Sequence, residues 1–282
     1  MKISLIIPTM NASSYIDELL KIIDSQTLKP HEIVIADSES DDNTVELCQK
    51  HPNVRIMSIR RDSFDHGRTR DEALRTCSGE YILFLTQDAL PRDEYYIENL
   101  VKAFEDDRVA VASGRQLPKA DATEAEKLIR EFNYPPKSFV RSKEDLKTLG
   151  VKTFFFSDAC SAYRKDRYLE LGGFEFPIMT DEDLFFAAKV IKAGYKIAYV
   201  ADAAVYHSHN LSLKEQYERN YIQGVEFKNH ADLLCGVSLE SEGKKMVKYV
   251  SSRLLKRGKI FSFIGFGFDC LARYLGSRAG RK

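Results

Sequence analysis

The clearest candidate for chemistry in this chain is an aspartate that follows a strongly apolar segment. Residues 81–85 form a run typical of a buried strand, and the polar residues Thr86, Gln87 and Asp88 follow at once. Ligands of open α/β sheets bind just beyond the carboxyl ends of such strands. A carboxylate there can hold a divalent cation against phosphate, because Mg²⁺ usually takes only one or two protein carboxylates. Taken alone, Asp88 fits a turn or a helix cap better than a metal site, and the other motifs of the chain reverse that preference.

Two other strand ends bring polar side chains to the same edge of the expected sheet. Pro8, Thr9 and Asn11 follow the first apolar strand, and Asp37 comes directly off the second. A carboxylate at Asp37 can accept hydrogen bonds from a nucleotide base or a ribose hydroxyl. The alternative for residues 8–11 is a proline turn with an asparagine helix cap. The acidic residues after Asp37 can likewise serve as caps of the next helix.

Basic residues stand where a loop enters a helix at residues 64–73. Helix N-termini attract phosphate through unpaired N–H groups, and arginine adds a bidentate donor. Arg68 and Arg70 are therefore candidate ligands of a pyrophosphate. A solvated, charged helix start explains the same residues equally well on local grounds.

Acidic and imidazole groups occur together in the second half of the chain. Asp181, Glu182 and Asp183 open an amphipathic helix, which is more acid than a helix cap requires, and one of them can serve as a general base. His207 and His209 end a predicted strand. One of the two can be an imidazole ligand to a metal held by Asp88.

The elements that must position these residues alternate between strand and helix. This rhythm predicts a parallel sheet with right-handed crossovers in the first part of the chain. The pattern is less regular after residue 113, and residues 137–150 form a polar segment that we expect to be an irregular excursion. The predicted strands are residues 3–7, 32–36, 54–59, 81–85, 109–113, 196–200 and 203–207. The predicted helices are residues 13–25, 42–49, 69–76, 95–104, 119–132, 181–193, 212–230, 243–257 and 260–274.

Composition narrows the class of protein. A chain of 282 residues can form one large domain, or one domain with an appendage, and its net charge of +0 gives no reason to expect a nucleic-acid partner. The five cysteines are scattered, odd in number and without CxxC spacing, which favours reduced thiols in a cytoplasmic protein over disulfides or a zinc site. The apolar run at the N-terminus is too short for a signal peptide, and no segment predicts a membrane-spanning helix.

The C-terminal stretch differs from the rest because it is strongly basic. Residues 260–268 are rich in Phe and Ile, and cationic residues flank them at 256–259 and 273–282. Such a helix fits insertion at an anionic membrane surface, here the inner face of the cell membrane. Packing on the domain itself, or on a partner in a homo-oligomer, explains the pattern equally well.

In this order along the chain, these residues resemble the family 2 glycosyltransferases of the GT-A fold, over residues 1–230. Four segments resemble the bacterial rhamnosyltransferases that use dTDP-rhamnose, namely residues 64–70, 86–89, 160–164 and 206–210. The resemblance implies a Rossmann-like, mostly parallel α/β sheet flanked by helices, with a C-terminal helical appendage. It divides the chain into a nucleotide-binding half at 1–115, an acceptor half at 116–230 and C-terminal helices at 231–282.

The resemblance implies an inverting transfer of a sugar, L-rhamnose from dTDP-rhamnose, to a glycan or lipid-linked saccharide acceptor in surface polysaccharide synthesis. Asp183 is the implied general base, with Asp181 as the alternative in a second register of the motif. The implied metal, Mg²⁺ or Mn²⁺, is held by Asp88 with His207, or alternatively His209. The implied donor-binding residues are Pro8, Thr9, Asn11, Asp37, His66, Arg68, Arg70, Gln87 and Asp88.

One departure from the family pattern keeps other interpretations open. The usual Asp-x-Asp is Thr86-Gln87-Asp88 here, which leaves one carboxylate and implies a weakly held or dispensable metal. The alternatives are another UDP- or dTDP-sugar as donor, or a non-catalytic module that binds a sugar nucleotide. The intact Glu182-Asp183 pair argues against the module. A nucleotidyltransferase would need a glycine-rich signature near the first strand, which residues 8–11 lack.

Overall fold

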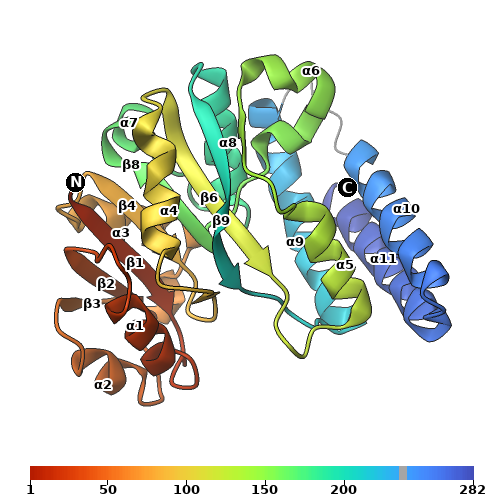
Figure 1. Ribbon diagram of the computed structural model, residues 1–282. Coiled ribbons are helices and arrows are strands. Elements are labelled where there is room, and N and C mark those ends of the chain that lie inside the picture. The colour runs from red at the N-terminus through yellow and green to blue at the C-terminus, as the bar shows by residue number, and fades with distance from the viewer. Residues whose placement is uncertain (235–239) are drawn as a thin grey trace.

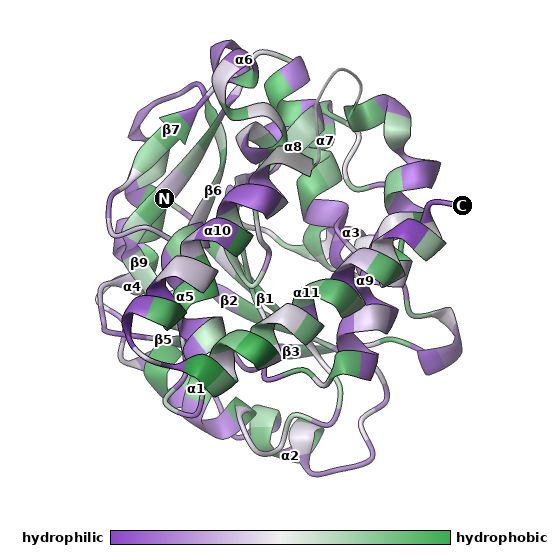
Figure 2. Ribbon diagram, turned by 90° about the vertical axis from the view of Figure 1, so that its right-hand side faces the viewer, coloured by the Kyte–Doolittle hydropathy of each residue, from purple (hydrophilic) through white to green (hydrophobic). Residues whose placement is uncertain are grey.

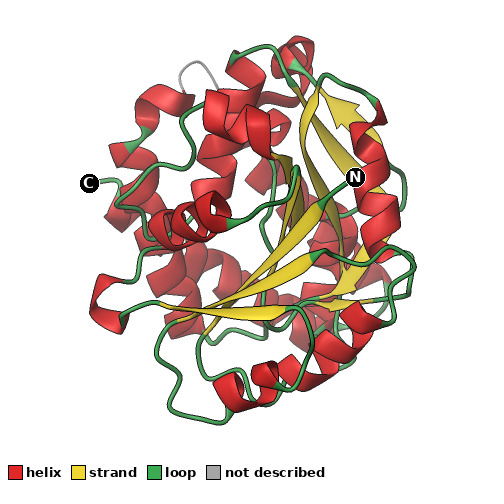
Figure 3. Ribbon diagram, turned by 90° about the vertical axis from the view of Figure 1, so that its left-hand side faces the viewer, coloured by secondary structure: helices red, strands yellow, loops and turns green. Residues whose placement is uncertain are grey.

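The structure, a computed structural model, describes residues 1–234 and 240–282, so that Cys235 lies outside the described residues. Its centre is one twisted sheet, in which the nine strands of the described residues follow the order β3-β2-β1-β4-β8-β6-β9-β5, with β7 added beside β9 (Figure 1). Helices cover both faces of this sheet (Figure 3). This is the α/β architecture that the alternating pattern predicts.

The first part of the sheet is parallel, as predicted. β1 lies between β2 and β4, and β3 continues the parallel order beyond β2. The strands here are β1 (Ile3–Thr9), β2 (Glu32–Asp37), β3 (Val54–Ser58) and β4 (Tyr81–Leu85). The helices between them are α1 (Ile16–Asp24), α2 (Thr44–Gln49) and α3 (His66–Thr76), of which α3 begins three residues before its predicted start.

The second part of the sheet is mixed. β8 (Cys160–Arg164) runs antiparallel between β4 and β6 (Val109–Leu117), and β6 is parallel to β9 (Lys196–Tyr206). The two strands predicted at 196–200 and 203–207 are one strand, because a register shift in the β6–β9 pairing absorbs the residues between them. β5 (Leu90–Pro91) pairs antiparallel with the end of β9.

The expected excursion at residues 137–150 is wrong in part. β7 (Phe139–Arg141) adds an antiparallel strand to β9, and the short helix α6 (Leu146–Leu149) follows. The Phe139 ring stacks on Tyr199 with their centroids 4.9 Å apart. The buried Arg141 guanidinium donates to backbone carbonyls of residues 152 and 155, which the polar composition of the segment did not reveal.

Side chains of alternate residues fill two cores, one on each face of the sheet. Along β1, Leu5 and Ile7 belong to the core under α1 and α4, whereas Ile6 belongs to the core under α3 and α8. Burial on both faces explains why the central strands read as continuous apolar runs. The remaining helices before the C-terminal ones are α4 (Tyr96–Val101), α5 (Glu124–Asn133), α7 (Lys165–Glu170) and α8 (Glu182–Lys192).

Three C-terminal helices form a separate layer beside α5 (Figures 1 and 2). They are α9 (Leu213–Asn229), α10 (Glu240–Lys256) and α11 (Ile260–Gly280). Leu128 of α5, Val250 of α10 and Phe266 of α11 share a small buried cluster, so these helices pack on the domain. Among the described residues no helix combines the length and the apolar character that crossing a bilayer requires.

Two glycines let α11 approach α9 closely. A Cβ atom at Gly276 would lie 2.3 Å from the carbonyl oxygen of Tyr217, and one at Gly280 would lie 2.0 Å from that of Tyr221. Glycine is therefore required at both positions, and the backbones of α9 and α11 are in contact. The packing alternative for the C-terminal stretch is thus correct for one face of α11.

Gly276→Ala should lower the free energy of unfolding by about 1–3 kcal/mol, because the added methyl group overlaps the Tyr217 carbonyl. Gly267→Ala on the same helix is the matched control, since its Cβ would meet no atom of the described residues within 4 Å. The control should gain about 0.5–1 kcal/mol, because alanine loses less backbone entropy in a helix. Urea denaturation followed by circular dichroism measures both changes, and equal effects would contradict the close packing.

Candidate functional site

A cleft of about 520 Å³ opens at the carboxyl ends of β1, β2 and β4. It brings together six of the predicted site residues: Pro8, Thr9, His66, Arg70, Gln87 and Asp88. Its other lining residues are Met10, Ser38, Arg61, Phe64 and Thr86. Asn11, Asp37 and Arg68 are not among them, and the roles predicted for these three in donor binding stay predictions. Arg68 is exposed, with its guanidinium 5.4 Å from the centre of the Phe176 ring.

Asp37 fixes the backbone at the ends of β1 and β2, next to this cleft. The parallel register sets it beside Thr9, whose hydroxyl donates to Oδ1 at 2.8 Å. Ser40 donates from its hydroxyl to Oδ1 at 2.6 Å and from its backbone N–H to Oδ2 at 2.9 Å. Asn11 links the same two loops, because its Oδ1 accepts from the backbone N–H of Asp41. In this structure the two side chains hold the strand ends together.

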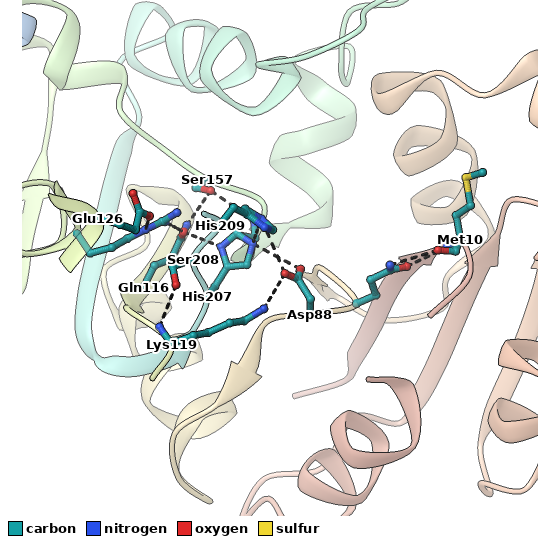
Figure 4. A network of polar contacts seen from close by, with 12 residues as sticks. Met10, Asp88, Gln116, Lys119, Glu126, Ser157, His207, Ser208 and His209 are labelled. Atoms are coloured by element: carbon teal, nitrogen blue, oxygen red, sulfur yellow. Dashed lines mark hydrogen bonds and ion pairs between the residues drawn. The ribbon is translucent and has the colours of Figure 1, made fainter. Parts of the chain in front are cut away.

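Gln87 connects the ends of β4 and β1. Its amide oxygen accepts from the Met10 backbone N–H at 2.8 Å, and its amide nitrogen donates to the Met10 carbonyl at 3.3 Å (Figure 4). The neighbouring Thr86 hydroxyl is buried, has no hydrogen-bond partner among the described residues, and lines the cleft. An unpaired buried hydroxyl is costly, which is typical of a group that pairs with a ligand.

Three strand ends converge on Asp88. β5 begins two residues after Asp88 and pairs with the last residues of β9, which lead into His207. Asp88 Oδ1 lies 3.5 Å from His207 Nε2, and Oδ2 lies 3.8 Å from His209 Nε2. The two imidazole nitrogens are 3.0 Å apart (Figure 4). Lys119, which follows β6, places Nζ 3.0 Å from Asp88 Oδ2.

A chain of hydrogen bonds fixes the tautomer of His207. Glu126 holds Arg130 at 2.6 Å, Arg130 donates to Oε1 of Gln116, and the Gln116 amide donates to Ser157 at 2.9 Å (Figure 4). Oε1 is therefore an acceptor, so His207 Nδ1, 2.9 Å away, must donate to it. The Nε2 lone pair of His207 then faces Asp88. Partners that orient a histidine in this way are typical of metal sites.

The ionisation states at this site suit a cation. Burial lowers the pKa of His207, and burial together with His207 lowers the pKa of His209 to about 4, so both rings are neutral near pH 7. Burial alone would raise the pKa of Asp88, but the positive charge and the hydrogen bond of the Lys119 ammonium group act against burial, and the pKa lies below its usual range. One carboxylate oxygen and two imidazole nitrogens lie within 4.8 Å of one another, which fits a divalent metal ion.

The acidic segment lies on the other side of Arg70. The Asp183 carboxylate accepts from the backbone N–H of Asp158 at 2.9 Å and from that of Leu184 at 2.7 Å. Arg70 is buried, 3.2 Å from Glu182 and 3.7 Å from Asp158. Asp181 points toward α9 instead, where Gln223 donates to both of its oxygens at 3.0 and 3.1 Å.

Burial and the crowding of carboxylates raise the pKa values of the aspartates in this segment. Burial raises the pKa of Asp183 well above its usual value, and the nearby Glu182, Asp158 and Asp181 raise it further. Burial also raises the pKa of Asp158 and of Asp181 to about 6 in each case. Carboxylates with raised pKa values beside a cleft are candidates for acid–base chemistry.

Asp65 joins the two sides of the site. Its side chain caps α3 by accepting from the Arg68 N–H at 2.7 Å, and it also accepts from the Ile178 N–H at 2.5 Å. Gly67 lets residue 175 approach, because a Cβ there would lie 2.3 Å from the Glu175 carbonyl oxygen. The segment that leads to Asp181 and Asp183 is thereby fastened to the helix that carries His66 and Arg70.

Three residues of the site were missed in the sequence. Lys119 and Gln116 belong to β6 and its carboxyl end, which reaches Leu117 and not residue 113 as predicted. The rule that strand ends carry function would have found both, had the strand been given its full length. Asp158 precedes β8 in an irregular segment, and only its position before an apolar strand marks it.

Solved structures with the same fold are glycosyltransferases. The chain aligns over 99% of its length, and 86% of the other chain, with the mannosyltransferase PcManGT from Pyrobaculum calidifontis in complex with GDP-Man and Mn²⁺, at a TM-score of 0.66 and 17% identity. S. aureus TarS 1–349 in complex with UDP-GlcNAc aligns with a TM-score of 0.59 and 18% identity, over 100% of this chain and 92% of that one. The sheet and its flanking helices have the GT-A fold.

The chain belongs to glycosyl transferase family 2, whose model matches residues 4–172. It is 45% identical over 226 residues to the O-antigen chain rhamnosyltransferase RfbN of Salmonella typhimurium, covering 80% of this chain and 72% of that protein. It is 39% identical over 224 residues to the O-antigen chain rhamnosyltransferase WbaN of Salmonella anatum, covering 79% and 71%. The predicted family and GT-A fold are therefore confirmed, and the protein is a glycosyltransferase.

Asp158→Asn should lower the pKa of Asp183, because it removes a negative charge that disfavours ionisation of Asp183. Carbon-detected NMR of the aspartate carboxyl groups across pH 3–9 measures the titration. Asp166→Asn is the matched control, since Asp166 is exposed and forms an ion pair with Arg167 on the surface. An unchanged titration of Asp183 in the Asp158 variant would show that burial alone sets its pKa.

Proposed function

We propose that this glycosyltransferase transfers L-rhamnose from dTDP-rhamnose, with inversion, to a saccharide acceptor in bacterial surface polysaccharide synthesis. The names of the two Salmonella relatives, at 45% and 39% identity, support rhamnose as the sugar. The observation that carries the catalytic part is the position of Asp183, a carboxylate of raised pKa linked through Arg70 to the donor cleft.

Asp183 is the general base of this mechanism. Its raised pKa gives it a useful affinity for a proton near neutral pH, and it takes that proton from the acceptor hydroxyl as the hydroxyl oxygen attacks the anomeric carbon. The bond between the anomeric carbon and the diphosphate breaks in the same step. Asp181 is the weaker candidate, because its carboxylate is turned toward α9, where Gln223 binds it.

The donor lies in the cleft at the strand ends. Pro8 and Thr9 contact the nucleoside, whose base or ribose pairs with the loop that Asp37 holds, and Gln87 and His66 border the diphosphate. Arg70 neutralises charge at the inner end of the cleft, next to the acids. Arg68 would have to swing inward to reach the diphosphate, since it stands beside Phe176 here.

Asp88, His207 and His209 would hold a divalent ion at the other end of the diphosphate. When bound, the ion stabilises the negative charge that develops on the leaving diphosphate. Two imidazole ligands make this site less suited to Mg²⁺ than an all-oxygen site, which favours Mn²⁺ between the two candidates. His207 has the better-fixed orientation, through Gln116.

Asp183→Asn should reduce transfer at least about a thousandfold and leave the affinity for dTDP unchanged, because the amide keeps the size of the side chain but cannot take a proton. Release of dTDP from dTDP-rhamnose with an acceptor, and calorimetry with dTDP, give the two readouts. Asp181→Asn is the matched control and should keep most of the activity. The reverse result would assign the base to Asp181, and preference of the wild type for a UDP-sugar would contradict rhamnose.

The outer face of α11 is the proposed contact with the membrane that carries the acceptor. Phe261, Ile264, Phe268, Leu271 and Leu275 recur at intervals of three and four residues, so they share one face, and each is about half exposed or more. Arg278 continues the same stripe, and exposed basic residues flank it at both ends (Figure 2). Apolar side chains with cations beside them suit an anionic bilayer surface. The enzyme would then act in the cytoplasm on a lipid-linked saccharide.

Replacing Phe261, Ile264 and Phe268 by Ser should weaken binding to phosphatidylglycerol vesicles at least about tenfold, because burial of each such side chain contributes about 1.5–3 kcal/mol. Vesicle co-sedimentation measures this, and high salt should reduce wild-type binding only in part. Leu169→Ser on α7 is the control, an exposed apolar residue on another helix. Deleting residues 260–282 would be a poor test, because it removes Phe266 and exposes the buried residues that Phe266 packs against. Dissociation of a dimer in the triple variant, without any vesicle binding by the wild type, would assign the stripe to a homo-oligomer.

A further inference from the structure

Lys119 occupies a position that neither the motif order nor the comparisons assign. It stands two residues beyond β6, and its backbone N–H donates to the Ser208 hydroxyl at 2.9 Å. Its ammonium group lies 5.2 Å from the centre of the Tyr15 ring and 3.0 Å from Asp88 Oδ2. Contacts to Ser208 and Tyr15 hold this cation beside Asp88, the carboxylate of the donor cleft where a metal ion would bind.

The ammonium group and a divalent ion compete for the same carboxylate. The two oxygens of Asp88 lie 3.5 Å from His207 Nε2 and 3.8 Å from His209 Nε2, and the ammonium group of Lys119 contacts the second of them. Like charges repel strongly at such distances in a partly buried site. When a metal ion takes Asp88, the Lys119 ammonium loses its partner and needs another anion nearby.

The donor diphosphate is that anion. A sugar nucleotide carries two negative charges on its diphosphate, whereas a divalent ion on one carboxylate and two neutral imidazoles has a net charge of only one. Lys119 supplies the second positive charge. During transfer the leaving diphosphate gains a third negative charge, and a cation placed beforehand stabilises it.

We propose that Lys119 is the second cation of the donor site: it is the counter-ion of Asp88 when the site is empty, and it binds the donor diphosphate when a metal ion occupies Asp88. With the lone carboxylate of Thr86-Gln87-Asp88, the site thus has a low affinity for a metal ion by itself and a high affinity when the nucleotide is bound. This inference rests on the proposed function, because it takes the ligand to be a nucleoside diphosphate.

Lys119→Met tests the inference through two affinities that should change in opposite directions. Without nucleotide, the variant should bind Mn²⁺ several-fold more tightly than wild type, because the competing ammonium is gone. With saturating Mn²⁺, it should bind dTDP about tenfold more weakly, because it lacks one charge-assisted hydrogen bond. Isothermal titration calorimetry measures both. Lys119→Arg keeps the charge and should stay close to wild type in each titration.

Two further variants control for the loss of a lysine charge elsewhere and for misfolding of Lys119→Met. Lys127→Met on α5 removes an exposed lysine that pairs with Glu124, and it should change neither affinity. Lys119→Gln is a second neutral variant, which must show the same pair of changes as Lys119→Met if the latter does not fold. Thermal melting curves establish that each variant is folded.

Affinities that fall together, or do not change, in both neutral variants would overturn the proposal and make Lys119 a structural residue. Failure of the proposed function has a different signature. In that case wild-type protein would bind no dTDP with or without Mn²⁺, while the Mn²⁺ titration alone could still show the competition between Lys119 and the metal ion.

Discussion

The active cleft depends on the buried guanidinium of Arg70. It comes from α3 on the donor side and contacts Glu182 and Asp158 on the acid side, at 3.2 and 3.7 Å. Burial lowers the pKa of Arg70, but Glu182, Asp158 and Asp183 raise it more, so the group remains charged. Loss of one partner from such a buried pair typically costs about 3–5 kcal/mol, since the other charge is left without compensation. Together with the contacts of Asp65, this side chain therefore sets the spacing between the residues proposed for donor binding and those proposed for catalysis.

The excess of carboxylates around Arg70 helps to raise their pKa values. Four carboxylates, Asp158, Asp181, Glu182 and Asp183, lie at this end of the site, and a single guanidinium cannot neutralise all of them. The surplus raises the pKa of Asp183, whereas Asp88 at the other end of the cleft is surrounded by Lys119 and two imidazoles and has a lowered pKa. Two carboxylates on either side of Arg70 thus have pKa values shifted in opposite directions, which suits the proposed base and the proposed metal ligand.

Much of this site could be predicted from local sequence because the parallel strands end in polar residues. Thr9, Asp37 and Asp88 were found in this way, and the parallel register brings the first two together. Lys119 and Asp158 were not found, because their position depends on pairing between distant segments. The register shift after Gly114 lengthens β6 to Leu117, and an antiparallel β8 between two other strands has no local signature. Periodicity likewise predicted the helix at α11 but not which of its faces would be buried, since Gly276 and Gly280 act through the backbone of α9.

The C-terminal layer is tied to the active site through α9. His209 lies three residues before Ser212, which caps α9 by accepting from the Glu215 N–H while Glu215 accepts from the Ser212 N–H. α11 then packs backbone to backbone along α9, and closely packed interiors transmit position with little slack. A surface that binds the outer face of α11 is therefore held at a fixed distance from Asp88 and His209. Because Gly276 and Gly280 form the face of α11 that meets α9, most of the large apolar residues outside the Phe266 cluster are exposed, where a monomer in water would gain nothing from them. The same packing thus orients the proposed membrane face and fixes the site at which a membrane-borne acceptor would have to arrive.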